Sequence, residues 1–125
     1  MNSSSYIPAH AQFALDAAAK AIDCAYDSYG VMLVGSCLER KDFRDVDVRC
    51  VLSDAEFEAL FPKDETQVLR PRWQVQCLAL SAWLRSLTGL PIDFQFQKIS
   101  VANEKFKGEK RVMLGNYAMA GDATT

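Results

Sequence analysis

The sequence predicts a single α/β domain, built as a small mixed β-sheet flanked by helices. Its 125 residues are enough for one compact domain and too few for two. Half of the residues are hydrophobic and 24% are charged, which is typical of a folded protein and excludes disordered and fibrous classes. Segments with helical periodicity are interspersed with short segments that alternate as strands do.

The first helix is expected over residues 9–29, which are rich in Ala and contain neither Gly nor Pro. Gly30 suits a left-handed cap at its end. The side chains at every fourth position are apolar and predict an amphipathic helix; they are Phe13, Ala17, Ala21, Ala25 and Tyr29, with Leu15, Ile22 and Tyr26 beside them. Residues 31–34 are short and apolar, which fits a strand buried on both faces that ends in a turn at Gly35 and Ser36.

The second strand is expected over residues 45–52, where charged and apolar residues alternate. Because successive side chains of a strand point to opposite faces, Val46, Val48 and Cys50 fall on one face and Asp45, Asp47 and Arg49 on the other. The eight residues before this strand are crowded with charge and predict a loop.

Two helices are expected next. Ser53 and Glu56 form a capping box that opens a short helix ended by Pro62. Residues 71–88 predict a long helix that packs on the sheet and stops at Gly89. Its apolar residues recur at alternating steps of four and three, at Trp73, Cys77, Leu80, Leu84 and Leu87.

A third strand is expected over residues 91–97, with Ile92, Phe94 and Phe96 in the core and Asp93 on the polar face. The tail, residues 99–125, carries weaker signals. They are a turn of helix over residues 101–106, a mixed charged stretch over 105–111 and a frayed end over 121–125. The domain prediction is therefore one unit over residues 1–125 with its core at about 10–98.

Charge, cysteine usage and hydropathy exclude several classes of function. Fourteen basic and 16 acidic residues give a net charge of −2, so no broad basic surface for nucleic acid is expected. The four cysteines form no Cys-x-x-Cys pair and there is one histidine, which argues against a zinc site and favours core thiols. No run approaches 18 apolar residues, and the first eleven residues carry no Lys or Arg, so we expect no membrane span, no signal peptide and a cytoplasmic location.

The acidic side chains are the candidate chemical site. Asp45 and Asp47 leave the same face two residues apart and repel each other, and a cation between them relieves that repulsion. Oxygen ligands select a hard ion such as Mg²⁺ or Mn²⁺. Asp93 faces the same side from a later strand. Three converging acids can hold two ions, which clamp the entering and leaving oxygens of a phosphoryl displacement.

The turn at Gly35 and Ser36 is the candidate phosphate-binding element. Gly35 allows close approach of the backbone, and the amides and hydroxyl around Ser36 can donate to phosphate oxygens. Arg40, Lys41 and Arg44 follow in the loop and can neutralise charge on the same phosphates.

A Gly-Ser pair is followed by eight residues and then by Asp-Val-Asp-Val, starting at Asp45. This pattern resembles the signature of the DNA polymerase beta-like nucleotidyltransferase superfamily, and within it the chain resembles the minimal nucleotidyltransferases most. The likeness covers about residues 10–98 and includes the order of helices and strands. It implies a nucleotidyltransferase fold and the transfer of a nucleoside monophosphate from a nucleoside triphosphate, ATP above all, to a hydroxyl, with release of pyrophosphate.

The same resemblance implies roles for individual residues. Ser36 would contact the nucleotide phosphates, Asp45 and Asp47 would ligate both Mg²⁺ or Mn²⁺ ions, and Asp93 would complete one ion's ligands and help deprotonate the acceptor. Arg44 departs from the pattern, because many relatives have a small residue before the first aspartate. Larger relatives also add a helical domain that holds base and acceptor, so here recognition of the acceptor falls to a second copy of the chain, a partner protein or the tail.

Two other classes of function stay open from the sequence. A non-catalytic module of the same fold, such as an antitoxin-like subunit, would hold a nucleotide or a partner protein without turnover. A hydrolase or nuclease using the same acids would need no acceptor.

Overall fold

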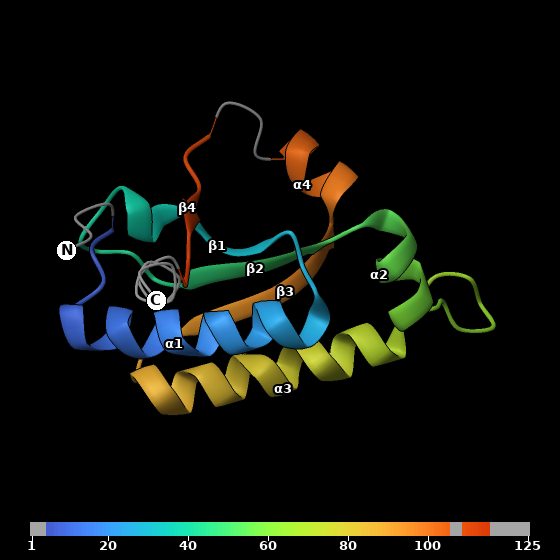
Figure 1. Ribbon diagram of the computed structural model, residues 1–125, viewed down its shortest axis with the longest axis horizontal. Coiled ribbons are helices and arrows are strands. Elements are labelled where there is room, and N and C mark those ends of the chain that lie inside the picture. The colour runs from blue at the N-terminus through green and yellow to red at the C-terminus, as the bar shows by residue number, and fades with distance from the viewer. Residues whose placement is uncertain (1–4, 106–108, 116–125) are drawn as a thin grey trace, which may run out of the picture.

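A four-stranded mixed sheet lies at the centre of the fold (Figure 1). The computed structural model describes residues 5–105 and 109–115, which form a mixed α+β domain with four α-helices. The elements of this described part are α1 (Ala9–Tyr26), β1 (Gly30–Val34), the 3-10 helix η1 (Ser36–Leu38), β2 (Val46–Leu52), α2 (Asp54–Leu60), α3 (Pro71–Thr88), β3 (Ile92–Lys98), α4 (Ile99–Lys105) and β4 (Val112–Met113).

The strand order is β3-β2-β1-β4. β1 is antiparallel to both β2 and β4, whereas β2 and β3 are parallel. Parallel neighbours need a long crossover, and α2 and α3 supply it. The resulting register pairs Asp47 of β2 with Asp93 of β3, and with Val34 of β1 on its other side.

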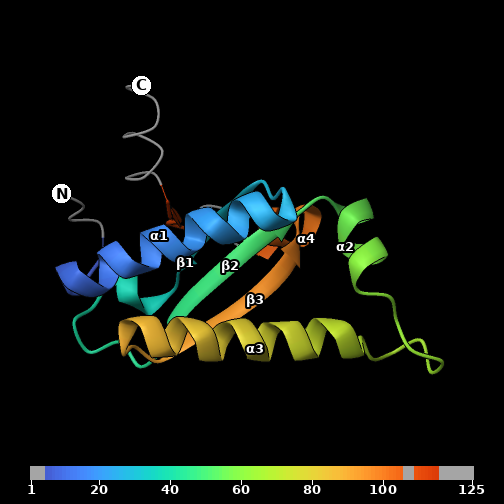
Figure 2. The same ribbon diagram turned by 60° about the horizontal axis from the view of Figure 1, so that its bottom comes forward.

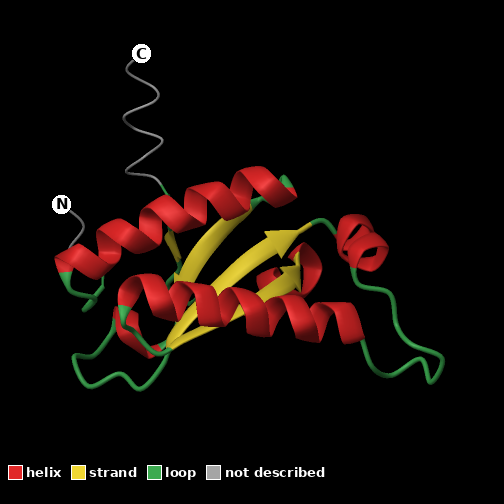
Figure 3. Cartoon of the chain, turned by 90° about the horizontal axis from the view of Figure 1, so that it is seen from below, coloured by secondary structure: helices red, strands yellow, loops and turns green. Residues whose placement is uncertain are grey.

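Helices cover the two faces of the sheet unequally. α1 and α3 lie side by side over one face, as Figures 2 and 3 show, and the main hydrophobic core lies between them and the strands. Its fully buried side chains include Leu15, Leu33, Val48, Leu84, Phe94 and Phe96. On the other face Val34 and Val51 pack with Ala102 of α4 in a small second cluster. The face that carries the acidic residues is therefore the less covered one.

Side chains of α3 close the outer edge of β3. The Ser81 hydroxyl accepts from the Phe94 amide at 2.9 Å and donates to the Phe94 carbonyl at 3.4 Å. Trp73 Nε1 donates to the Phe96 carbonyl at 2.9 Å, and Arg85 Nε to the Ile92 carbonyl at 2.9 Å. Because these groups occupy the outward-facing hydrogen-bonding positions of β3, the edge does not offer a free template for another strand.

We predict that Ser81→Ala destabilises the protein by about 1–3 kcal/mol, because it leaves the buried Phe94 amide without an acceptor. Ser86→Ala is the matched control, since Ser86 is an exposed serine of the same helix whose hydroxyl donates to the Trp83 carbonyl. Urea denaturation measures both. Equal urea midpoints for the two variants would show that the contact between Ser81 and Phe94 does not stabilise the protein.

The ends of α3 and the start of α2 are confirmed. α3 spans Pro71–Thr88 with Gly89 in the left-handed cap position, and α2 is capped by the Ser53 hydroxyl, which accepts from the Glu56 amide. Along β2 and β3 the apolar side chains face the core, as the alternation predicts. One prediction for α3 is wrong: Leu87 is exposed, and Ser81 and Thr88 are buried instead. The Ser81 hydroxyl accepts from the Phe94 amide of the strand edge, whereas the Thr88 hydroxyl donates to the Leu84 carbonyl of its own helix and accepts from the Leu90 amide.

The prediction for the first helix is wrong at its end and on its face. α1 stops at Tyr26, and Asp27, not Gly30, adopts the left-handed conformation at φ 50°. Aspartate tolerates this conformation, and Tyr29 already donates to the Val51 carbonyl of the sheet. The buried stripe runs through Leu15 and Ile22 and includes Ala18, whereas Phe13 is 59% exposed. Alanines occur all around this helix, so the apolar pattern alone does not fix which face packs.

The tail contains more regular structure than the sequence predicts. α4 begins at Ile99, two residues before the predicted turn, and β4 joins the sheet beside β1. A strand of two residues shows no alternation, so the sequence gives no signal for it. The stretch predicted as frayed, residues 121–125, lies outside the described residues. No helix of the described part is both long and apolar enough to cross a membrane.

Candidate functional site

The candidate site begins with two aspartates on adjacent parallel strands. Asp47 and Asp93 are register partners on β2 and β3, and both carboxylates lie on the sheet face opposite the main core. One guanidinium nitrogen, Nη2 of Arg49, is 3.8 Å from Oδ1 of Asp47 and 3.3 Å from Oδ2 of Asp93. Asp45 is exposed and immediately precedes β2. The sequence-predicted pair from different strands is thus brought to one place.

Gly35 lies against the Asp47 carboxylate. Its φ is +84°, and a Cβ built on it would stand 2.5 Å from Oδ2 of Asp47. β1 and β2 are antiparallel with Val34 opposite Asp47, so the turn after β1 returns to the start of β2. Only glycine fits both the backbone conformation and the space. The predicted phosphate-binding turn and the predicted metal ligand are therefore neighbours in space.

The Asp47 carboxyl is surrounded by charges of both signs. Partial burial raises its pKa, and the carboxylates of Asp93 and Asp45 raise it further. The cations Arg49 and Lys105 act in the opposite direction. An additional cation beside Asp47 would relieve both the desolvation and the repulsion, so the chemistry of this donor set fits a hard divalent ion.

Arg49 is the site residue that the sequence did not single out. It is only 6% exposed, and Nη1 donates to the Val48 carbonyl at 3.0 Å and to the Asp93 carbonyl at 2.7 Å. Strand alternation puts Arg49 on the polar face, yet an arginine there is ordinarily solvated. Its burial depends on the neighbouring strand, and Asp93 of that strand is 44 residues away in the chain.

A polar cavity of about 420 Å³ adjoins the turn. Its lining residues are Gly35, Ser36, Glu39, Arg40, Glu109 and Lys110. Of the three basic residues predicted for phosphate contact, Arg40 lines this cavity, whereas Lys41 and Arg44 are exposed in the loop that follows. Arg40 also forms an ion pair with Asp42 at 3.6 Å. Lys110 and Glu109 are new to the site, and their place in a charged stretch of the tail gave no signal for it.

Cys37 has no role in this chemistry. Its thiol is buried and lies 3.8 Å from the Val34 carbonyl. Burial, with a smaller contribution from Asp47, raises the pKa of the Cys37 thiol to about 11, so it is neutral at physiological pH. The expectation of core thiols is confirmed for Cys37, Cys50 and Cys77 and is wrong for Cys24, which is exposed.

Among the residues that the structure describes, no three His, Cys, Asp or Glu side chains are gathered closely enough to form a metal-binding group. Asp47 and Asp93 instead share the Arg49 guanidinium, and the exposed Asp45 immediately precedes β2. Asp47 is therefore the acid common to two pairs, one with Asp45 along the chain and one with Asp93 across the strands.

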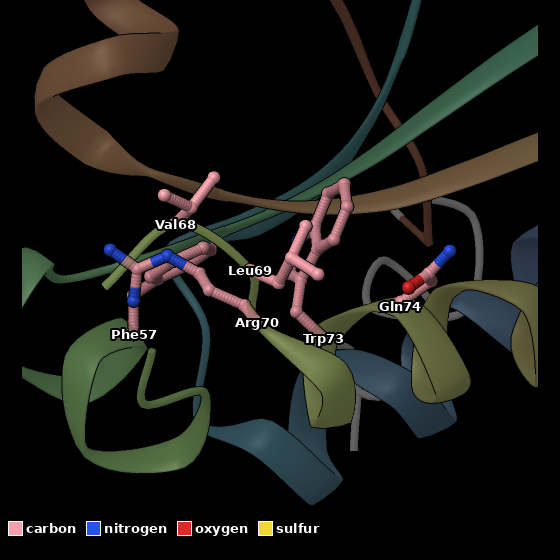
Figure 4. Close-up of a pocket in the computed structure, with 6 residues that line it drawn as sticks. All are labelled: Phe57, Val68, Leu69, Arg70, Trp73 and Gln74. Carbon is pink, nitrogen blue, oxygen red and sulfur yellow. The ribbon is translucent and has the colours of Figure 1, made fainter. Parts of the chain in front are cut away.

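A second cavity, of about 420 Å³ and mainly apolar, lies between α2 and the start of α3 (Figure 4). Its lining residues are Phe57, Val68, Leu69, Arg70, Trp73 and Gln74. The Arg70 guanidinium lies over the Phe57 ring, 5.1 Å from its centroid, and is held by both carboxylate oxygens of Glu58. None of the acidic residues of the candidate site lines it, so this cavity is separate from that site.

We predict that Gly35→Ala lowers the metal-dependent transfer expected from the sequence roughly 100-fold, because the new methyl group displaces the Asp47 carboxylate. Gly89→Ala is the matched control: its φ is +72°, and a Cβ there meets nothing within 4 Å among the described residues. Both variants carry the backbone strain of about 1–2 kcal/mol expected for a left-handed alanine. If the two variants retained equal activity, the close approach of Gly35 to Asp47 would not be needed for activity.

The chain matches no protein-family model, no curated protein and no solved structure in the three comparisons made, so its function rests on the site itself.

Proposed function

We propose that this protein is a metal-dependent nucleotidyltransferase of the DNA polymerase beta-like superfamily, which moves a nucleoside monophosphate from ATP or a similar triphosphate to a hydroxyl acceptor. The observation that carries the proposal is the position of Asp47, which is in register with Asp93 and in contact with Gly35. The element order of helix, Gly-Ser strand, Asp-x-Asp strand, helices and a strand with a third acid also agrees with it.

Asp45, Asp47 and Asp93 are the residues that would hold Mg²⁺ or Mn²⁺. When bound, a divalent ion supplies charge neutralisation for the triphosphate and lowers the cost of the developing charge on its leaving oxygen. The raised pKa of Asp47 supports this assignment, because its causes are burial and the two other acids of the set.

The chain's own groups bind the nucleotide and move one proton. Ser36, Arg40 and Lys110 line the polar cavity beside the acids and would donate to phosphate oxygens. Asp93 would take the proton of the acceptor hydroxyl. The acceptor oxygen then bonds to the α-phosphorus, the bond from that phosphorus to the β-phosphate oxygen breaks, and pyrophosphate leaves.

A surface for contact with another protein is available away from the acids. Apolar side chains of α3 and of the segment before it are exposed, namely Val68, Leu69, Val75 and Leu78. Exposed apolar groups that lie together are typical of protein contacts. Because α3 covers the sheet face opposite the acids, a protein bound there would not itself hold the acceptor. The same surface favours the second candidate function, a non-catalytic module that binds nucleotide and partner.

The test is incubation of the purified protein with each α-labelled nucleoside triphosphate, with Mg²⁺, Mn²⁺ or EDTA. The candidate acceptors are the protein itself, RNA with a free 3′ hydroxyl, other proteins and small polyols. We expect labelled acceptor and pyrophosphate that both require the metal. Nucleotide binding without product across the acceptors would support the non-catalytic module, and hydrolysis without acceptor would support a hydrolase; either result contradicts the transferase.

A further inference from the structure

The position between Asp47 and Asp93 is already held by a cation, Arg49. Its Nη2 contacts both carboxylates, at 3.8 Å and 3.3 Å. An ion shared by these two acids would have to enter the space that this nitrogen takes, and it would meet a fixed positive charge there. The arginine and such an ion therefore compete for one place.

Hydrogen bonds hold the Arg49 side chain in this position. Nη1 donates to two backbone carbonyls, those of Val48 and Asp93, and the residue is 6% exposed. A guanidinium that left this position would lose its acceptors in a site with little water, which is costly for a buried charge. Within the part of the chain that the structure describes, Nε of Arg49 is buried and has no hydrogen-bond partner. In this orientation the guanidinium contacts both carboxylates and both carbonyls through its Nη atoms, while its Nε makes no hydrogen bond.

The charge of the cluster agrees with this arrangement. The two oxygens of the Asp47 carboxylate face different neighbours, since Oδ1 faces Arg49 and Oδ2 faces Gly35. Asp45 is exposed and lies two residues before Asp47. The open side of the cluster is therefore the side of Asp45 and the Gly35 turn, next to the polar cavity. The carboxylate oxygen of Asp47 that faces away from Arg49 lies on that side, and not between the strands.

We propose that Arg49 is a built-in cation that replaces one of the two expected metal ions, so that the site binds a single divalent ion on Asp45 and Asp47. This inference rests on the proposed function, because it assumes that the acids bind a metal. Arg49 is then a positioning residue: it holds the Asp93 carboxylate and carbonyl in place beside β2, and the single ion serves the triphosphate.

The test is the binding stoichiometry of Mn²⁺ alone, measured from the electron paramagnetic resonance signal of free Mn²⁺. We expect one bound ion for the native protein and two for Arg49→Met, which keeps the length of the side chain and removes its charge. Arg49→Lys keeps a cation and should bind one ion. Arg72→Met, which removes an exposed arginine of α3 away from the acids, is the matched control and should also bind one.

The outcomes separate the two proposals. Two ions on the native protein, or one ion on both the native protein and folded Arg49→Met, would overturn the role of Arg49 and leave the proposed function standing. No ion on either would overturn the proposed function and this inference with it. Circular dichroism shows whether Arg49→Met folds; if it does not, the native stoichiometry and that of Arg49→Lys still decide, because two ions on either contradict a built-in cation.

Discussion

Replacing Asp47 with asparagine is expected to lower metal-dependent nucleotidyl transfer by at least about 1,000-fold while the protein stays folded. Asp47 is the acid on which the site converges: it faces Asp93 across the strands, lies against Gly35 and contacts Arg49. Asparagine keeps the shape of the side chain and removes the charge that a cation needs. Product formation at saturating Mg²⁺ and Mn²⁺ measures the loss.

The same variant has an expected signature in stability. Folding raises the pKa of Asp47, so this carboxyl favours the folded state at low pH and that contribution is lost as the pH rises through the raised value. At neutral pH the charged carboxylate is therefore a cost that asparagine removes. In EDTA at pH 7 the melting temperature of Asp47→Asn should equal or exceed that of the native protein, and the difference should shrink below pH 3.8, where an ordinary aspartate is protonated in both states.

Asp42→Asn is the matched control for this experiment. Asp42 is an exposed carboxylate of the loop before β2 and pairs with Arg40. It should retain activity and metal dependence. Undiminished transfer by Asp47→Asn would remove the acids from the chemistry altogether, and equal losses in both variants would point to a general effect of loop charge.

Phe96→Ala is expected to destabilise the protein by about 3–5 kcal/mol, the largest effect on stability among the variants considered. Phe96 is buried at the centre of a cluster of rings, with centroids 4.7 Å from Tyr26, 4.9 Å from Phe61 and 5.0 Å from Phe94. These rings come from α1, β3 and the segment after α2, so the cavity left by alanine would loosen several elements at once. Because domains are stable by only about 5–15 kcal/mol, the loss is a large part of the total.

Urea denaturation of Phe96→Ala and of Phe13→Ala measures this effect. Phe13 undergoes the same truncation on the exposed face of α1, where the cost should stay below about 1 kcal/mol. Equal costs at the two positions would mean that the ring cluster does not hold the sheet to its helices.

Much of the fold follows from local signals. Pro71 and Gly89 bound α3 because one residue suits a first turn and the other a left-handed cap, and neither depends on tertiary contacts. The faces of β2 and β3 follow from alternation with period two. The end of α1 does not follow, since Asp27 adopts a conformation that the sequence assigns more readily to Gly30.

Only part of the candidate site can be predicted from local sequence. Alternation predicts the face of its strand on which each of Asp47 and Asp93 lies. Their pairing in register depends on the crossover through α2 and α3. The burial of Arg49 between them depends on the same register. Glu109 and Lys110 reach the Gly-Ser turn from the far end of the chain, and the two-residue strand β4 brings that segment beside β1. No spacing in the sequence encodes these encounters.

The central claim is that the acids beside Gly35 bind a divalent ion together with a nucleoside triphosphate. A crystal soaked with Mn²⁺ and a non-hydrolysable triphosphate tests it directly, because the anomalous signal of manganese locates the ion and the density locates the phosphates. We predict manganese at the carboxylates of Asp45 and Asp47, with the phosphates against Ser36 in the polar cavity. Manganese elsewhere on the chain, or a nucleotide seated in the apolar cavity between α2 and α3, would contradict the claim.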